Sequence, residues 1–235
     1  MLEFENKVAV KICGVTNVRD AITCAEAGAD MLGLNFSARS LRCVEPKTAR
    51  EIVEAVRAKF PRTKLVGVFL DQDAALVKTV AADLALDAVQ LHGNETPDYV
   101  RELAVSVIPA DAARGAVVAG DGDPGRPKTR PDLPPPGSTP PATTFVIKAL
   151  RVSRVRPDAA GYDCAAILLD TWSAQDPGGT GETFPWAIAA ELRPMVNRLI
   201  LAGGLTSANV AEAIREVRPF AVDVCSGVES ALGRK

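Results

Sequence analysis

Two segments near the end of the chain combine an apolar run with glycine in a pattern that suits phosphate binding. Residues 201–205 (LAGGL) and 222–228 (VDVCSGV) each read as a buried strand that runs into a glycine-containing turn. Glycines at strand ends expose backbone N–H groups where the next helix begins, and such groups bind phosphate. In a barrel of eight βα units, the loops after strands 7 and 8 form that site. The pattern predicts an enzyme or binding protein for a phosphorylated small molecule, whose phosphate would be bound at Gly203, Gly204, Ser226 and Gly227.

A third glycine cluster, PGGTG at residues 177–181, follows an earlier apolar run. A glycine cluster alone is more often a flexible turn. Beside the two segments above, it predicts further phosphate-facing amides from Gly179, Thr180 and Gly181.

Three side chains at the same predicted face could do chemistry. Cys13 and Asp170 each end an apolar run, at the strand ends where barrel enzymes carry their catalytic groups. A thiol and a carboxylate across one pocket can act as general base and general acid. The ordinary alternative is a small buried thiol and a turn or cap carboxylate, and position alone does not decide between them. Arg42 lies in a nearby loop, where it is either solvated or suited to a substrate carboxylate.

The elements that must carry these residues read as alternating strands and helices. Asp30, Asp87, Asp163 and Asp223 each precede or open a hydrophobic run, at intervals that suit strands 2, 4, 6 and 8 of a (β/α)8 TIM barrel. Short apolar runs at 8–12, 65–70, 145–149 and 198–202 supply the odd-numbered strands. Helices are expected between them, for example at 46–59, which begins with proline.

Alternation of side chains along strands predicts a polar layer inside this barrel. Lys11 on strand 1 and Asp223 on strand 8 would pair there, and Lys148 on strand 5 would also point inward. Such a layer is as consistent with a structural role as with a catalytic role for Lys11.

We expect one domain over residues 1–235, because 47% of the residues are hydrophobic and α/β barrels of this size are undivided. An insertion at about 109–143 separates helix 4 from strand 5. It holds nine prolines and five glycines between residues 109 and 141, too few apolar groups to fold by itself. Only six residues follow Glu229, so the eighth helix is expected to be shortened or absent. Trimming explains this, and so does a neighbouring subunit in a homodimer.

Composition argues against several classes of protein. The formal charge is −2 and no basic stripe is present, which disfavours nucleic acid as a partner. No apolar run is long enough for a membrane span or a secretion signal, so we expect a cytoplasmic protein without a membrane partner. Five cysteines without C-x-x-C spacing and a single histidine favour free thiols and no metal site.

Together these segments resemble the phosphoribosylanthranilate isomerase family of tryptophan biosynthesis. The resemblance covers nearly the whole chain except the insertion, in the order VKICGVT (10–16), GLNF (33–36), SLR (40–42), GVF (67–69), VQLHG (89–93), LD (169–170), GGTG (178–181), LAGGL (201–205) and DVCSGVE (223–229). Two positions depart from the family pattern: Pro185 stands where aspartate is usual, and Cys225 where serine is usual.

The resemblance implies an Amadori rearrangement of N-(5-phosphoribosyl)anthranilate to 1-(2-carboxyphenylamino)-1-deoxyribulose 5-phosphate, without metal or organic cofactor. In this interpretation Asp170 is the general acid, Cys13 the general base and Arg42 the residue that binds the anthranilate carboxylate. The glycine-rich strand ends bind the phosphate.

Two other readings stay open from the sequence. The analogous isomerase of histidine biosynthesis is a similar barrel but uses a carboxylate at the end of strand 1, where this chain has Cys13. A non-catalytic phosphate-binding barrel would retain the glycines without turnover, and the presence of both Cys13 and Asp170 argues against it.

Overall fold

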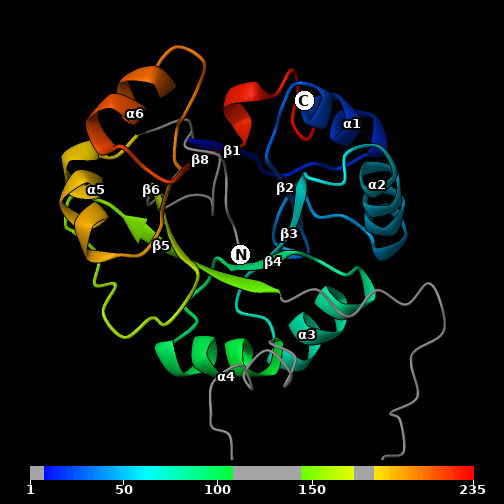
Figure 1. Ribbon diagram of the computed structural model, residues 1–235, viewed down its shortest axis with the longest axis horizontal. Helices are drawn as coiled ribbons and strands as arrows, with labels where there is room; N and C mark the ends of the chain where they lie inside the picture. Colours follow the sequence, from blue (N-terminus) through cyan, green and yellow to red (C-terminus); the bar gives the residue numbers. More distant parts are fainter. Residues whose placement is uncertain (1–7, 108–143, 172–182) are drawn as a thin grey trace, which may run out of the picture.

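The computed structural model describes residues 8–107, 144–171 and 183–235. Eight parallel strands form a closed barrel in chain order, with β1 paired to both β2 and β8 (Figure 1). The predicted TIM barrel is therefore confirmed. The strands are β1 (Ala9–Ile12), β2 (Met31–Asn35), β3 (Lys64–Phe69), β4 (Ala88–Leu91), β5 (Phe145–Val152), β6 (Ala166–Thr171), β7 (Leu199–Leu201) and β8 (Ala221–Val224).

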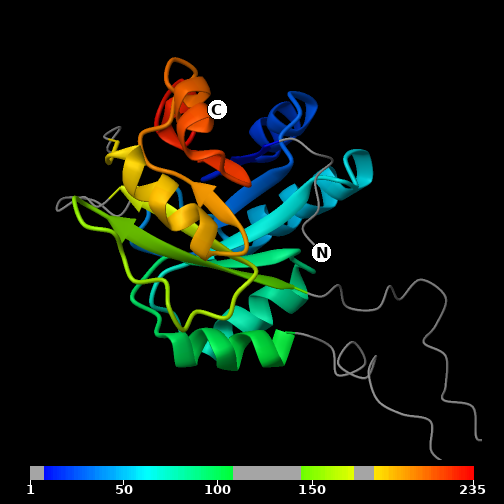
Figure 2. The same cartoon turned by 60° about the vertical axis from the view of Figure 1, so that its left-hand side comes forward.

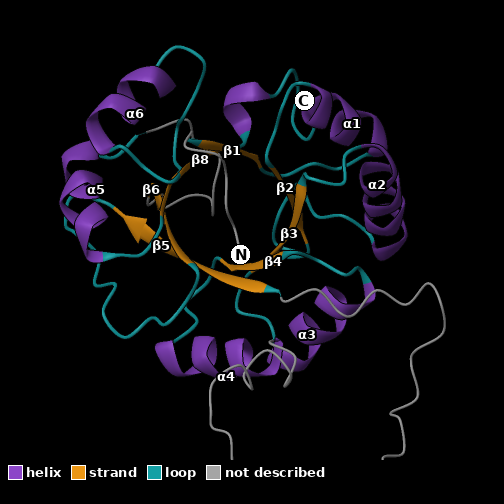
Figure 3. Ribbon diagram, in the orientation of Figure 1, coloured by secondary structure: helices purple, strands orange, loops and turns teal. Residues whose placement is uncertain are grey.

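Helices surround this ring of strands, as Figure 3 shows. Figure 2 shows α3 and α4 lying along one side of the sheet. The described helices are α1 (Val18–Glu26), α2 (Pro46–Lys59), α3 (Ala74–Asp83), α4 (Pro97–Val107), α5 (Trp186–Leu192) and α6 (Val210–Val217), with 3-10 turns η2 (Arg193–Met195) and η3 (Ser226–Val228).

Helix α2 illustrates how the sequence sets an element. Pro46 occupies its first turn, where the missing N–H needs no partner and the fixed φ suits a helix. Ile52, Val53 and Val56 form its buried face, and basic side chains lie in its last turn, where they favour the helix dipole. The helix has the bounds predicted from the sequence.

The connection between β5 and β6 departs from the expected alternation, because residues 153–165 contain no helix. They run as turns and bends, and strand β6 begins at Ala166. Tyr162 and Cys164 pack against the hydrophobic core, and the Tyr162 hydroxyl donates to the Glu95 carbonyl at 3.2 Å. This connection of thirteen residues includes Pro157 and Gly161, which disfavour a helix. Its side chains, and not a helix, cover this part of the barrel wall.

The segment after β8 contains η3 and an isolated bridge between Ala231 and Arg234, and no α-helix through Lys235. Its end lies beside α1 in Figure 1, where the Lys235 N–H donates to the Asp20 carboxylate at 2.9 Å. The predicted insertion at 109–143 lies outside the described residues.

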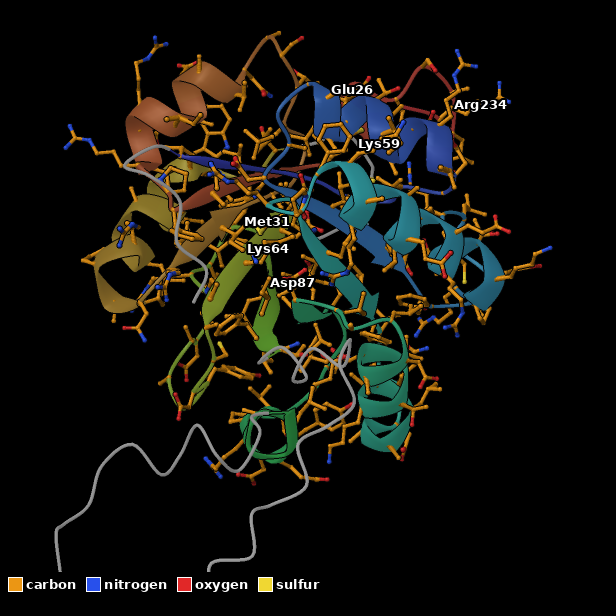
Figure 4. The ribbon with its side chains drawn as sticks, turned by 45° about the vertical axis from the view of Figure 1, so that its right-hand side comes forward. Glu26, Met31, Lys59, Lys64, Asp87 and Arg234 are labelled. Carbon is orange, nitrogen blue, oxygen red and sulfur yellow. The ribbon has the colours of Figure 1, made fainter. Side chains whose placement is uncertain are left out.

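Two layers of apolar side chains make up the core. One layer lies between the strands and the helices. The other lies inside the ring of strands and includes Met31, Val66 and Ile200. Figure 4 shows Met31 near Lys64 and Asp87, at the end where the strands begin. The Lys64 ammonium is 3.1 Å from the Asp87 carboxylate.

The pair of charged side chains predicted inside the barrel is present. Lys11 and Asp223 are register partners in β1 and β8 and form an ion pair at 3.0 Å. The prediction that Lys148 also points inward is wrong, because its neighbours Ile147 and Ala149 in β5 belong to the apolar cluster inside the barrel and side chains alternate along a strand. Lys148 lies on the outer face of β5, where it pairs with Glu95 at 2.7 Å, and each of these two side chains is only 2% exposed. Glu95 also accepts the backbone N–H groups of Asp71 and Gly93. The second pair thus holds the loops that follow β3 and β4.

Replacing Lys148 by methionine would leave the Glu95 carboxylate buried without its cation. We expect the free energy of unfolding to fall by about 3–5 kcal/mol. Lys78→Met is the matched control, because Lys78 pairs with the largely exposed Glu102, and such pairs contribute about 0–1 kcal/mol. Urea denaturation measures both. Equal losses in the two variants would contradict the assigned importance of the buried pair.

Candidate functional site

A cavity of about 830 Å³, including the solvent in its mouth, opens at the carboxyl ends of the strands. This is the face where barrel enzymes carry their active sites. The structure brings six of the sequence-predicted residues together in its lining: Cys13, Arg42, Asp170, Gly203, Gly204 and Ser226. Gly179, Thr180 and Gly181 lie outside the described residues.

The predicted phosphate-binding glycines differ in their surroundings. Gly203 and Gly204 adopt φ of +86° and +61°, a region that favours glycine. A side chain on Gly203 would also collide with Thr171. Gly227 does not line the cavity; a Cβ there would collide with the Leu205 carbonyl, so this glycine allows the loops after β7 and β8 to approach each other closely.

Cys13 is held at the end of β1 by its backbone N–H, which donates to the Val224 carbonyl at 2.9 Å. A Cβ on Gly33 would lie 2.8 Å from the Cys13 sulfur and 3.2 Å from the Lys11 Nζ. The thiol and the ammonium therefore share the space that Gly33 leaves open. The sequence indicated the strand position of Cys13 and left open which group acts on its thiol.

Burial raises the pKa of the Cys13 thiol, and the neighbouring Lys11 ammonium opposes this by stabilising the thiolate. Burial also disfavours the charged form of Lys11, but the attraction of Asp223 and Cys13 outweighs it and raises the Lys11 pKa. Lys11 thus stays charged beneath the thiol. The net effect leaves Cys13 a weaker acid than an ordinary cysteine.

Asp170 lies across the cavity at the end of β6. Its Oδ1 accepts the Thr171 N–H at 2.8 Å, and its Oδ2 is 3.1 Å from the His92 Nε2. The Gln90 amide lies 2.7 Å from the His92 Nδ1. A neutral imidazole can donate to an ionised carboxylate or accept from a protonated one, depending on its tautomer. Because the Gln90 Nε2 can only donate, the Nδ1 of a neutral His92 accepts from it, and the His92 Nε2–H donates to the Asp170 carboxylate.

Gln90 and His92 have no role assigned from the sequence. The detectable signal was their alternation with apolar residues on β4, which directs both toward the interior. Contact with Asp170, from β6, required the closed barrel.

Arg42 forms a bidentate ion pair with Glu229. Its Nε donates to Oε1 at 2.7 Å and its Nη2 to Oε2 at 2.8 Å. Although burial alone would raise the pKa of Glu229, hydrogen bonds from Arg42 and Lys235 hold it below its usual value. The contact of Glu229 with Arg42 and that of Lys235 with Glu229 were not predicted from the sequence.

Within the described part of the chain, no cluster of three or more His, Cys, Asp or Glu side chains could hold a metal ion. Among the helices in these same ranges, none is long and apolar enough to cross a membrane.

Comparison with known families gives a match over residues 10–114 and 139–235 to the model of N-(5'-phosphoribosyl)anthranilate isomerase. The chain belongs to this isomerase family. Relatives of that name from Trichlorobacter lovleyi and Geobacter sulfurreducens are 40% and 39% identical, each over 97% of this chain and 92% of the relative. The predicted enzyme class and its function in tryptophan biosynthesis are confirmed.

Solved structures agree with this assignment. The phosphoribosylanthranilate isomerase of Thermus thermophilus has a TM-score of 0.74 at 32% identity, covering 97% of this chain and 92% of its own. A structure of an isomerase of this family with reduced 1-(o-carboxyphenylamino)-1-deoxyribulose 5-phosphate has a TM-score of 0.68 at 33% identity, with the same coverage. The match to the isomerase family favours the tryptophan-pathway reading over the histidine-pathway alternative.

The two departures from the family pattern lie beside described elements. Pro185 precedes α5 and supplies no side-chain cap, because it has no polar side chain. Cys225 lines the cavity, and burial raises its pKa to about 12, so at neutral pH it is an uncharged thiol.

The raised pKa of Cys13 predicts how its alkylation by iodoacetamide depends on pH. Only the thiolate reacts, so the rate at Cys13 should keep rising above pH 9.0, the value of an ordinary cysteine. In Lys11→Met/Asp223→Asn, which removes both buried charges, the profile should move further to alkaline pH because Lys11 has the larger effect. Peptide mass spectrometry follows each cysteine separately.

Cys43 is the internal control, because burial and Glu45, not Lys11, shift its pKa. Its profile should be the same in both proteins. A Cys13 profile that stays in place or moves to lower pH in the double variant would contradict the assigned role of Lys11.

Proposed function

We propose that this cavity catalyses the Amadori rearrangement of N-(5'-phosphoribosyl)anthranilate to 1-(2-carboxyphenylamino)-1-deoxyribulose 5-phosphate, with Asp170 as general acid and Cys13 as general base. One observation carries the proposal. A thiol and a carboxylate line the same cavity from β1 and β6, and each has its own polar partner, Lys11 and His92. The substrate is inferred from the family to which the chain belongs.

In the first step Asp170 gives its proton to the ring oxygen of the ribose. The bond between that oxygen and C1 breaks, and the lone pair of the anthranilate nitrogen forms the C1–N double bond of a protonated Schiff base. The Thr171 N–H and His92 hold the carboxylate that remains. Asp170 lines the cavity, so its carboxyl group can reach a ligand bound there.

In the second step the Cys13 thiolate removes the proton from C2. The electrons of the C–H bond form a C1–C2 double bond, and the C1–N π electrons return to nitrogen, which gives the enolamine. Protonation at C1 and loss of the hydroxyl proton yield the ketone. The protonated Schiff base is the electron sink, so the proposal needs no cofactor. The Lys11 ammonium stabilises the thiolate that starts this step.

The remaining site residues bind the ends of the substrate. Arg42 would bind the anthranilate carboxylate, for which a guanidinium is suited by its paired donors. The backbone around Gly203, Gly204 and Ser226 would bind the phosphate, with Gly227 permitting the loop approach. Gly179, Thr180 and Gly181 belong to this part of the proposal on the family resemblance alone.

The proposal extends to a homodimer of single-domain chains in the cytoplasm. The relative from Thermotoga maritima, described as a dimeric phosphoribosylanthranilate isomerase from which monomers were generated, is 33% identical with a TM-score of 0.68. The family model matches on both sides of residues 115–138, which supports one domain interrupted by an insertion.

Decay of the substrate's anthranilate-type fluorescence tests the proposal. The parent should consume freshly generated phosphoribosylanthranilate rapidly. Cys13→Ala and Asp170→Asn should each lower kcat by a factor of about 10³ or more, since each removes a group that moves a proton in the reaction. Asparagine keeps the shape of Asp170 and loses the transferable proton.

Cys43→Ala and Asp163→Asn are matched controls at exposed positions, and both should retain parental activity. A folded parent that binds the product analogue without turnover would favour a non-catalytic phosphate-binding barrel. Ordinary turnover in Asp170→Asn would remove its assignment as the acid.

A further inference from the structure

Three charged side chains stand in a row at one wall of the cavity. Arg42 comes from the loop after β2, and Glu229 and Lys235 come from the segment after β8. The Lys235 Nζ lies 3.1 Å from the same Glu229 Oε1 that accepts from Arg42 at 2.7 Å. The side chains are 12%, 6% and 3% exposed in the order Arg42, Glu229, Lys235. Solvent exposure thus decreases along the row.

The position of the row relative to the cavity separates the roles of its members. Arg42 lines the cavity, whereas Glu229 and Lys235 do not. Glu229 contacts the edge of the guanidinium formed by Nε and Nη2. A guanidinium has five N–H donors, so the Nη1 end remains outside this pair. Glu229 therefore fixes the plane of Arg42 from behind and leaves one end of it for a ligand.

The charges of the row decide whether that end attracts an anion. The charges of Arg42 and Glu229 alone sum to zero, so a carboxylate that enters the cavity would meet a cation already neutralised by Glu229. Lys235 brings the sum of the three to +1. Because burial weakens solvent screening, the third charge acts across the short distances of the row.

Lys235 is itself held in place by several contacts. Its Nζ donates to the Cys225 carbonyl at 2.9 Å, and its backbone N–H donates to Asp20 in α1 at 2.9 Å. The preceding Gly233 accepts a hydrogen bond from Thr16 at 2.6 Å and donates to Glu229 at 3.2 Å. The ammonium is thus preorganised beside Glu229 in the absence of ligand.

We propose that Lys235 is a positioning residue for recognition of the aromatic carboxylate, acting through Glu229 on Arg42. Glu229 orients the guanidinium, and Lys235 restores the positive charge that Glu229 would otherwise cancel. The inference rests on the proposed function, in which Arg42 binds that carboxylate. The low pKa of Glu229 agrees with it, since the carboxylate stays ionised between its two cations.

Binding of two ligands to the full-length protein tests the proposal without requiring turnover. The first is reduced 1-(o-carboxyphenylamino)-1-deoxyribulose 5-phosphate, and the second is the same compound without the carboxylate. Isothermal titration calorimetry should show that the parent prefers the carboxylated ligand. Lys235→Met should weaken binding of the carboxylated ligand about tenfold and leave the affinity for the other ligand unchanged, because one buried charge no longer supports Arg42.

The adjacent Arg234 provides the matched control. It is exposed, and Figure 4 shows it at the outer surface, so Arg234→Gln removes the same charge without touching the row. Its affinities should equal those of the parent. Lys235→Arg, which keeps the charge, should retain most of the preference. Melting temperatures of all variants separate loss of folding from loss of binding.

A double-mutant cycle tests whether Lys235 acts through Arg42. Arg42→Met should abolish the preference for the carboxylate, and Lys235→Met should then have no further effect. A full effect of Lys235→Met in that background would overturn the proposal in favour of direct contact. If Lys235→Met behaves as Arg234→Gln does, the inference fails while the role of Arg42 stands. Equal binding of both ligands by the parent would overturn the role of Arg42 and the inference together.

Discussion

The buried ion pair between Lys11 and Asp223 joins β1 to β8, the two strands whose pairing closes the barrel, and it does so directly beneath Cys13. A buried pair of this kind contributes little net stability, because desolvation of both charges offsets their attraction. Its consequence here is local. It keeps a cation beside a thiol that burial would otherwise make still harder to ionise. The closure of the fold and the chemistry of its proposed base thus share one contact.

Polar side chains of the cavity are held by partners from other strands or loops. Lys11 in β1 is held by Asp223 in β8, and Asp170 in β6 faces His92, at the end of β4. Arg42, after β2, is fixed by Glu229 after β8. These cross-strand pairs cannot form until the barrel is closed. A cavity with fixed side chains is therefore a property of the complete sheet, which suits reactions that depend on preorganised groups.

The sequence could predict what depends on local patterns and strand alternation. It predicted the barrel, the bounds of α2, the Lys11–Asp223 pair and the strand ends that carry Cys13 and Asp170. It did not predict the helix-free connection at 153–165, because a segment with scattered apolar residues can cover a barrel wall in more than one way. The contact of Glu229 with Arg42 was also missed. It joins residues 187 positions apart, and no periodicity records such a contact.

A crystal structure with reduced 1-(o-carboxyphenylamino)-1-deoxyribulose 5-phosphate would show whether Cys13 and Asp170 flank one ligand in this cavity. We expect the Cys13 sulfur to lie about 3–3.5 Å from C2 of the ligand, as reacting atoms require. Asp170 should hydrogen-bond the oxygen that belonged to the ribose ring, and Arg42 should contact the carboxylate. A fully occupied ligand whose C2 faces away from Cys13, with Asp170 bound only to His92, would contradict this arrangement.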